Sequence, residues 1–200
     1  ISVMLPRAAV SADRVDEILT SSTLIHDPEN PVHFGENGNG EVRFEQVSFR
    51  YPGAEEDVLY DISFTAESGK TTALIGSTGS GKSTLVNLIP RFYDVTEGRI
   101  TIDGVDIRDI SQKELRERLG YVPQKGVLFS GDIASNILYG NPEGSEEEMR
   151  EAANIAQASE FIEEKQKGYQ SPIAQGGTNV SGGQKQRLSI ARAIAKHPDV

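Results

Sequence analysis

The chain has 200 residues, of which 36% are hydrophobic and 25% are charged, and its formal net charge is −10. This length fits one domain, or one domain with an appendage. The absence of Cys excludes a disulfide scaffold. No run approaches the roughly 18–20 consecutive apolar residues that cross a bilayer. An acidic surface repels phosphate backbones, so we expect no nucleic-acid partner.

The first forty residues are predicted to form a helix and then a linker. Apolar side chains recur at helical spacing between residues 8 and 19, which is typical of a short amphipathic helix. Residues 20–40 are rich in Ser, Asn, Pro and Gly without an apolar period, which indicates a linker. The helix is either an N-terminal brace or a connector to an upstream domain. Because the chain starts at Ile1 and stops at Val200, we expect it to be a piece of a longer protein.

Antiparallel strands are predicted after the linker. Residues 42–49 hold two alternating apolar pairs with a phase slip between them, which predicts a strand with a bulge. Residues 58–64 alternate cleanly, as in a half-buried antiparallel strand. Between residues 99 and 107, the Asp103-Gly104 pair separates alternating apolar residues, which predicts a two-residue hairpin.

Two short apolar runs, residues 72–75 and 119–122, are also predicted to be strands, the first buried on both faces. Ser-x-x-Glu pairs at residues 111–114 and 145–148 predict capping boxes that open helices. A last helix is expected to start near Ser181 and to end before Pro198. The order is therefore antiparallel strands, then mixed strands and helices, then a helical stretch.

A glycine-rich loop between the predicted strand at residues 72–75 and an apolar helical period matches G-x-x-x-x-G-K-[ST]. Its residues are Gly76, Ser77, Thr78, Gly79, Ser80, Gly81, Lys82, Ser83 and Thr84. The three glycines are expected to take backbone conformations that are closed to other residues, so that successive N–H groups point toward phosphate oxygens. Lys82 can reach the β- and γ-phosphates, and the Ser83 hydroxyl can ligate Mg²⁺. The alternative is a Gly/Ser turn with an unrelated Lys.

This loop predicts binding of a nucleoside triphosphate, but it does not choose among small-molecule kinases, GTPases, motor ATPases and transporter ATPases. No Asn/Thr-Lys-x-Asp motif for reading guanine follows it, which disfavours a GTPase.

A second anion site is predicted where the last helix begins. Its residues are Ser181, Gly182, Gly183 and Gln184. Ser181 is an N-cap residue, and two glycines in the first turn leave bare amides at the positive end of the helix. The alternative is a capped helix whose glycines permit close packing.

These two motifs, with Tyr121-Val122-Pro123-Gln124 between them, closely resemble the nucleotide-binding domain of ATP-binding-cassette (ABC) transporters, in particular of exporters. The resemblance implies an α/β P-loop NTPase cassette with an antiparallel β subdomain, a mixed β/α core and a helical subdomain at about 125–195. Residues 1–40 would be a linker from an absent membrane domain. Residues 41–200 would be the nucleotide-binding domain, truncated before the Walker B strand.

The resemblance also implies roles for matching residues. Tyr51 would stack on adenine, although an ordinary aromatic at a strand end is the alternative. Lys82 and Gln124 would be catalytic residues. Gln124 would approach Mg²⁺, and its loop would meet the membrane domain; the alternative is an ordinary loop residue. Two domains of the family pair head to tail, so the Ser181–Gln184 segment would cap the γ-phosphate of ATP on the partner's P-loop.

The implied function is ATP binding and hydrolysis that power export, at the cytoplasmic face of the cell membrane, together with transmembrane domains. The Walker B Asp, its adjacent carboxylate and the switch His are not in the sequence, so we expect the chain alone to be inactive. Residues 174–177 depart from the exporter pattern and resemble one half of asymmetric exporters, which leaves homodimer and heterodimer open. Two other functions remain open: a soluble ABC ATPase acting on DNA or ribosomes, and a degenerate cassette that binds ATP without turnover.

Overall fold

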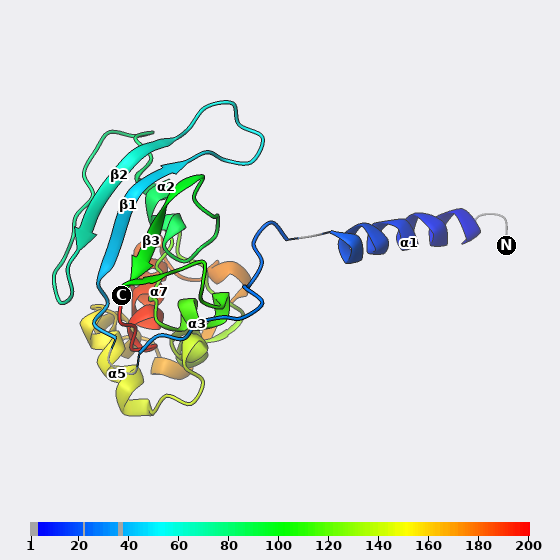
Figure 1. Cartoon of the computed structure of the whole chain (residues 1–200). Coiled ribbons are helices and arrows are strands. Elements are labelled where there is room, and N and C mark those ends of the chain that lie inside the picture. The colour runs from blue at the N-terminus through cyan, green and yellow to red at the C-terminus, as the bar shows by residue number, and fades with distance from the viewer. Residues whose placement is uncertain (1–3, 22, 36–37) are drawn as a thin grey trace.

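The computed structural model describes residues 4–21, 23–35 and 38–200. Helix α1 (Met4–Thr20) extends away from the rest of the molecule (Figure 1), and its side chains from residue 7 onward are exposed. The helix predicted at residues 8–19 is therefore confirmed and begins earlier. Within the described ranges, no helix has both the length and the apolar character that a membrane span requires.

The sheet is antiparallel throughout and has the strand order β2-β1-β3-β4. Its strands are β1 (Val42–Phe49), β2 (Leu59–Ala66), β3 (Glu97–Ile102) and β4 (Val105–Asp106). The register shifts between Phe44 and Val47, where Gln46 has a φ of 50°, which confirms the predicted bulge. Asp103 and Gly104 both have positive φ, 50° and 81°, as the predicted two-residue hairpin requires.

The helices after the linker are short. They are α2 (Lys82–Leu88), α3 (Gln112–Glu117), α4 (Ile133–Ile137), α5 (Glu146–Ile155), α6 (Ser159–Glu163) and α7 (Gly182–Ile194). A small ribbon of β5 (Gly131–Asp132) and β6 (Pro172–Ile173) and three 3₁₀ turns, Leu138–Gly140, Gly168–Gln170 and Gln175–Gly177, complete the fold.

The two predicted capping boxes have different outcomes. At the start of α5, Ser145 and Glu148 each bind the other's backbone N–H, which confirms the full box. At the start of α3, the Ser111 hydroxyl accepts from the N–H of Glu114 at 3.2 Å, but the return bond is missing. The Glu114 carboxylate instead accepts from the backbone N–H of Phe34 at 2.9 Å, because the linker passes beside α3.

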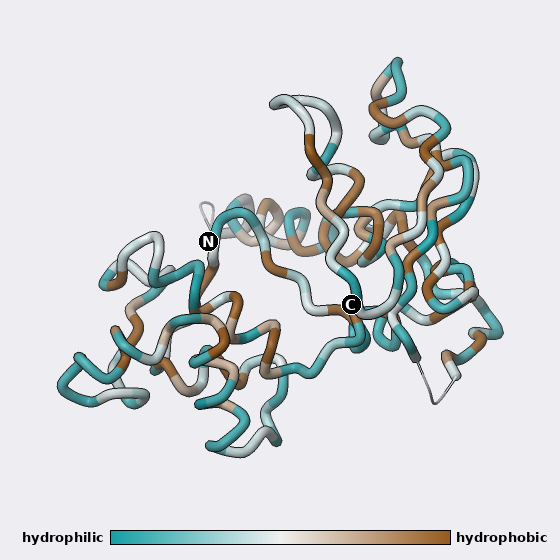
Figure 2. Tube along the Cα trace, turned by 90° about the vertical axis from the view of Figure 1, so that its left-hand side faces the viewer, coloured by the Kyte–Doolittle hydropathy of each residue, from teal (hydrophilic) through white to brown (hydrophobic). Residues whose placement is uncertain are grey.

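Hydrophobic side chains form two separate clusters. Hydrophobic segments are spread over the trace of the chain (Figure 2). One cluster joins the sheet to α2 and α3 through residues such as Phe44, Leu88 and Leu115. The other gathers α4 to α7 and lies between Leu128 and Ala195. The helix that follows the P-loop, α2, therefore packs in the first cluster, and α7, which begins with the Ser-Gly-Gly-Gln segment, packs in the second.

The two strands predicted at residues 72–75 and 119–122 are wrong. The described part of the chain has no strand at either segment, and the first segment is exposed, with Ile75 at 95%. An isolated strand has no partner for its backbone N–H and C=O groups, so an apolar run by itself does not make a strand. The amide of Gly120 instead bonds to the carbonyl of Val200 at 2.8 Å.

Candidate nucleotide site

The P-loop turns into helix α2 through two residues with left-handed backbone. Gly79 and Gly81 both have a φ of 84°, and Gly81 is the N-cap of α2. The positive φ favours glycine at position 81, and a Cβ there would also lie 2.8 Å from the Leu59 side chain, which would have to move. Gly76 does not have positive φ, contrary to the prediction for all three glycines. Its lack of a side chain instead leaves room for the hydroxyl of Ser80, which would lie 2.7 Å from a Cβ at this position.

The ammonium group of Lys82 lies over the loop and donates to three neutral oxygens. These are the carbonyls of Gly76 at 2.9 Å and Ser77 at 2.6 Å, and the hydroxyl of Ser80 at 3.2 Å. No carboxylate pairs with Lys82 in the part of the chain that the structure describes. An anionic phosphate can therefore bind this cation without displacing an ion pair.

A cavity of about 420 Å³ brings Lys82 and Ser83 together with Gln124, which lies 42 positions after Lys82 in the sequence. The loop that carries Gln124 is held against α2, because the hydroxyl of Tyr121 donates to the Asn87 side chain at 2.9 Å. A hydroxyl and an amide oxygen are hard ligands that suit Mg²⁺ when phosphate oxygens complete its shell. No Asp or Glu of the described residues lines this cavity.

Tyr51 lies beside the P-loop helix rather than free in solvent. Its hydroxyl forms a 2.8 Å hydrogen bond with the hydroxyl of buried Thr84. Its ring, which is half-buried, packs edge-on against Phe49 and Tyr93, with centroid distances of 4.8 and 5.2 Å. The structure thus places Tyr51 next to the loop and gives it neighbours that hold its ring.

The second predicted anion site is a fully formed and exposed helix start. The Ser181 hydroxyl accepts from the N–H of Gln184 at 3.2 Å, and the Gln184 side chain accepts from the N–H of Ser181 at 3.1 Å. A Cβ at Gly182 or Gly183 would meet nothing within 4 Å. Close packing within the described chain therefore does not explain these glycines.

A connection between the Gln124 loop and helix α7 escaped the sequence reasoning. A Cβ at Gly126 would lie 2.8 Å from the backbone oxygen of Lys185, so the loop and the helix are in direct contact. Arg192, about two turns further along α7, donates to the carbonyl of Val127 at 2.9 Å. In the sequence, the trace of this contact is the glycine at position 126. The sequence pattern by itself does not distinguish this glycine from any other loop glycine.

The loop, the helix-start dipole and the lysine define the class of the protein: a P-loop nucleotide-binding domain. Residues 59–200 match the family model described as "ABC transporter". The chain therefore belongs to the ABC transporter family and is its ATP-binding cassette, so the predicted family and fold class are confirmed.

Known relatives are similar over almost the whole chain. An uncharacterised ABC transporter ATP-binding protein of Mycobacterium bovis is 48% identical over 98% of this chain and 34% of its own length. A putative multidrug export ATP-binding/permease protein of Bacillus subtilis, YgaD, is 45% identical over 98% of this chain and 34% of its own. A solved bacterial Atm1-family ABC exporter with ATP bound is 36% identical, with a TM-score of 0.88, over 96% of this chain and 33% of that one. The chain spans about a third of the length of these relatives.

Proposed function

We propose that this chain is the ATP-binding and ATP-hydrolysing domain of an ABC exporter, acting on the cytoplasmic face of the membrane with transmembrane domains as partners. The putative multidrug export name of the YgaD relative and the Atm1-family exporter structure support the export assignment. The match of this chain to a third of each relative supports further domains in the working protein.

The observation that carries the proposal is that the described residues contain two glycine-containing helix starts and that only one of them, the start of α2, lines the cavity that also contains Gln124. Lys82 and Ser83 line that cavity, whereas no residue of the Ser181–Gln184 segment does. The open space around Gly182 and Gly183 leaves their N–H groups accessible to a second molecule. Head-to-tail pairing of two cassettes, identical or different, would place this segment of one against the γ-phosphate held by Lys82 of the other.

Within one cassette, Lys82 would neutralise charge on the β- and γ-phosphates, and the loop amides would bind the phosphate oxygens. The P-loop residues Gly76 to Thr84 would therefore hold ATP, with Tyr51 against its adenine. Mg²⁺ would be held by Ser83 and Gln124 and would supply charge neutralisation between the phosphates.

Turnover needs a group that orients the attacking water or accepts its proton, and a carboxylate is one group that can do so. No carboxylate of the described residues lines the cavity that contains Lys82 and Gln124. We therefore expect residues 1–200 by themselves to bind ATP without hydrolysing it, whereas the working transporter hydrolyses it.

A groove beside the Gln124 loop fits the membrane domains as partner. A cavity of about 340 Å³ lies between the two clusters and is lined by Phe92, Tyr121 and Tyr139, which are 41%, 39% and 61% exposed. Exposed aromatic side chains around a concave surface favour protein binding. Arg192 lines the same groove and stacks near Tyr139, and burial lowers its pKa.

Calorimetric titration of the chain with ATP and Mg²⁺ tests the proposal. We expect saturable binding of one ATP per chain and no release of phosphate, together with ATPase activity in the transporter that contains this cassette. Absence of ATP binding by the folded chain would overturn the assignment. If the transporter binds ATP but never hydrolyses it, this chain is instead a degenerate, regulatory cassette.

A further inference from the structure

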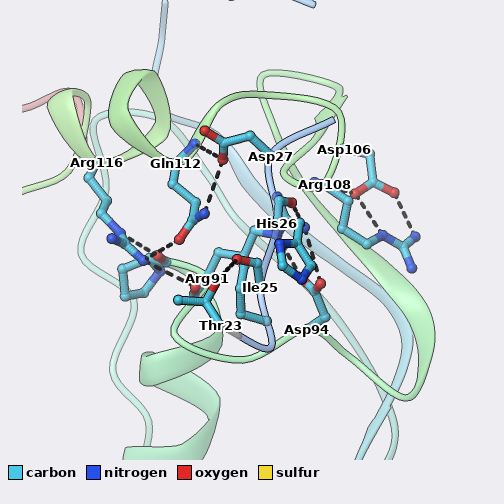
Figure 3. Close-up of polar contacts among 11 residues, drawn as sticks. Thr23, Ile25, His26, Asp27, Arg91, Asp94, Asp106, Arg108, Gln112 and Arg116 are labelled. Atoms are coloured by element: carbon cyan, nitrogen blue, oxygen red, sulfur yellow. Dashed lines mark hydrogen bonds and ion pairs between the residues drawn. The ribbon is translucent and has the colours of Figure 1, made fainter. Parts of the chain in front are cut away.

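The linker is docked on the cassette by polar contacts at residues His26 and Asp27 (Figure 3). The carbonyl of His26 accepts a hydrogen bond from Arg91 at 3.1 Å. The carboxylate of Asp27 accepts from the backbone and side-chain N–H groups of Gln112, at 2.9 and 3.0 Å. Two further linker amides are held, Val32 by the carbonyl of Asp109 and Phe34 by Glu114.

Arg91 is an unusual residue for an anchor. Its side chain is only 6% exposed, and it forms a two-pronged ion pair with Asp94 at 2.6 and 3.1 Å. Its Nη1 group is buried and has no hydrogen-bond partner among the described residues. Its backbone is left-handed, with a φ of 54°, which costs a non-glycine residue free energy. A buried charge with incomplete partners is rarely a stabilising device, which points to a role in positioning.

Arg91 is connected to the nucleotide site along the chain. It follows α2, the helix that starts at Lys82, and its N–H bonds to the carbonyl of Leu88 at 3.1 Å. Helix α2, of seven residues, therefore connects the P-loop to the turn that holds Arg91 without an intervening loop.

The turn from Arg91 to Asp94 also contacts the nucleotide site through its side chains. Tyr93 packs edge-on against Tyr51 at 5.2 Å, and Tyr51 is bonded to Thr84 of the P-loop helix. The turn from Arg91 to Asp94 therefore contacts the linker with its first residue and the proposed adenine-binding ring with its third.

A further set of contacts connects the linker to the end of α2 through α3. Gln112, which Asp27 holds, accepts from Arg116 at 3.1 Å through its side-chain oxygen. Arg116 in turn donates to the carbonyl of Pro90 at 3.1 Å, one residue before Arg91. The linker, α3 and the end of α2 are thus joined in one polar circuit, which Figure 3 shows from Asp27 to Arg116.

We propose that Arg91 is a positioning residue that couples the nucleotide site to the linker. ATP on the P-loop strengthens the docking of residues 23–34, and a docked linker strengthens ATP binding by the same factor, since linkage between two binding equilibria is reciprocal. The inference rests on the proposed function, because it takes ATP as the ligand of the P-loop.

Hydrogen exchange of the Val32 and Phe34 amides, measured in the whole chain with and without ATP and Mg²⁺, tests the coupling. Both amides are hydrogen-bonded only while the linker is docked. We expect ATP to slow their exchange by about fivefold or more. Arg91→Gln and the milder Arg91→Lys should abolish this response, because neither side chain reproduces the fork that holds Asp94 and His26 together.

The matched control is Arg108→Gln. Arg108 forms a similar two-pronged ion pair with Asp106, drawn in Figure 3, and no hydrogen bond to the linker in the described residues. The control should keep the full ATP response. Asp27→Ala, an exposed substitution that leaves Arg91 in place, should weaken ATP binding by about fivefold.

The outcomes separate this inference from the proposed function. ATP binding without slower exchange at Val32 and Phe34 overturns the coupling alone. So does an ATP response that survives in both Arg91 variants, or an Asp27→Ala chain with unchanged ATP affinity. A folded chain that does not bind ATP overturns the proposed function and the coupling together.

Discussion

Lys82 is held by neutral oxygens of its own loop, so its charge is available to a ligand. Tyr51 has the opposite character, because its hydroxyl and its ring are already engaged with Thr84, Phe49 and Tyr93. At the scale of residues, we therefore expect substitution of Lys82 to affect ATP binding, through the lost charge and through the lost hydrogen bonds to its own loop. Substitution of Tyr51 should affect both the ligand and the local packing.

Lys82→Ala should weaken ATP binding roughly tenfold to a hundredfold, since a hydrogen bond to a charged group contributes about 1.5–3 kcal/mol. Calorimetric titration measures the change. The control is Lys70→Ala, because Lys70 is an exposed residue paired with Glu67 and lies outside the loop. Equal affinity in the Lys82 variant and the wild type would contradict the assignment of the P-loop.

Tyr51→Ala should weaken ATP binding by about 1–3 kcal/mol, the value typical of one base stacked on an aromatic ring. Tyr51→Phe keeps the ring and loses only the bond to Thr84, so its ATP affinity should stay close to the wild type. Tyr51→Trp should also retain binding. Titration with ATP and with inorganic triphosphate separates the roles, because only the nucleotide senses the ring. Equal losses in the Ala and Phe variants would mean that Tyr51 serves the fold and not adenine.

At the scale of elements, α2 and α7 present their N-termini in different surroundings. The start of α2 belongs to a cavity with Gln124, whereas the start of α7 is exposed and surrounded by open space. A change at the α7 start should therefore act on partner binding and leave the nucleotide site of the same chain intact.

Gly182→Asp should bind ATP normally as a monomer and fail to form an ATP-dependent dimer. A carboxylate about 4 Å from the incoming γ-phosphate costs about 4 kcal/mol at an effective dielectric constant near 20. Size-exclusion chromatography with ATP, on the hydrolysis-blocked cassette of the full transporter, measures dimerisation.

Gly182→Ala is the matched control for folding. Nothing lies within 4 Å of its Cβ, and Ala is the better helix former, so the fold should gain up to about 1 kcal/mol. Dimer formation by the Asp variant on addition of ATP would show that α7 caps no partner nucleotide.

At the scale of the whole molecule, the linker joins a protruding helix to a cassette built on two hydrophobic clusters (Figure 1). The docking of the linker depends on two carboxylates. Hydrogen bonds from the backbone and side chain of Gln112 lower the pKa of Asp27. Hydrogen bonds from His33 and from the backbone of Phe34 lower the pKa of Glu114.

Acid should therefore weaken the docking of the linker on α3. A lowered pKa in the docked state means that docking is fully stabilised above the ordinary values of 3.8 for Asp27 and 4.5 for Glu114. The stabilisation is lost as pH falls through the lowered values. Amide chemical shifts of Phe34 and Gln112, followed by NMR from pH 7 downward, should move in that acidic range.

In Asp27→Asn combined with Glu114→Gln, the acid-dependent movement of these two amides should disappear. Persistence of the same titration in the double variant would show that other groups control docking.

Local patterns in the sequence were sufficient for the elements that complete their own hydrogen bonds or pair with a neighbour. The hairpin at Asp103-Gly104, the bulge near Gln46 and the full capping box at Ser145 are examples. The residues of the P-loop and of the Ser181–Gln184 segment follow equally from the sequence, because each motif is contiguous. Their roles with ATP are still predictions.

Tertiary structure decided whatever depends on partners distant in the sequence. The apolar run at residues 72–75 is not a strand, because no described segment offers it a backbone ladder. The Glu114 carboxylate does not complete the capping box with Ser111, because it accepts a hydrogen bond from the amide of Phe34, 80 positions away. Arg91 forms its hydrogen bond with His26, and Gln124 lines the same cavity as Lys82, only because the chain folds back on itself. The period of the apolar residues predicts which side of a helix or strand a residue lies on. A contact between residues distant in the sequence depends instead on which other segments pack against that side.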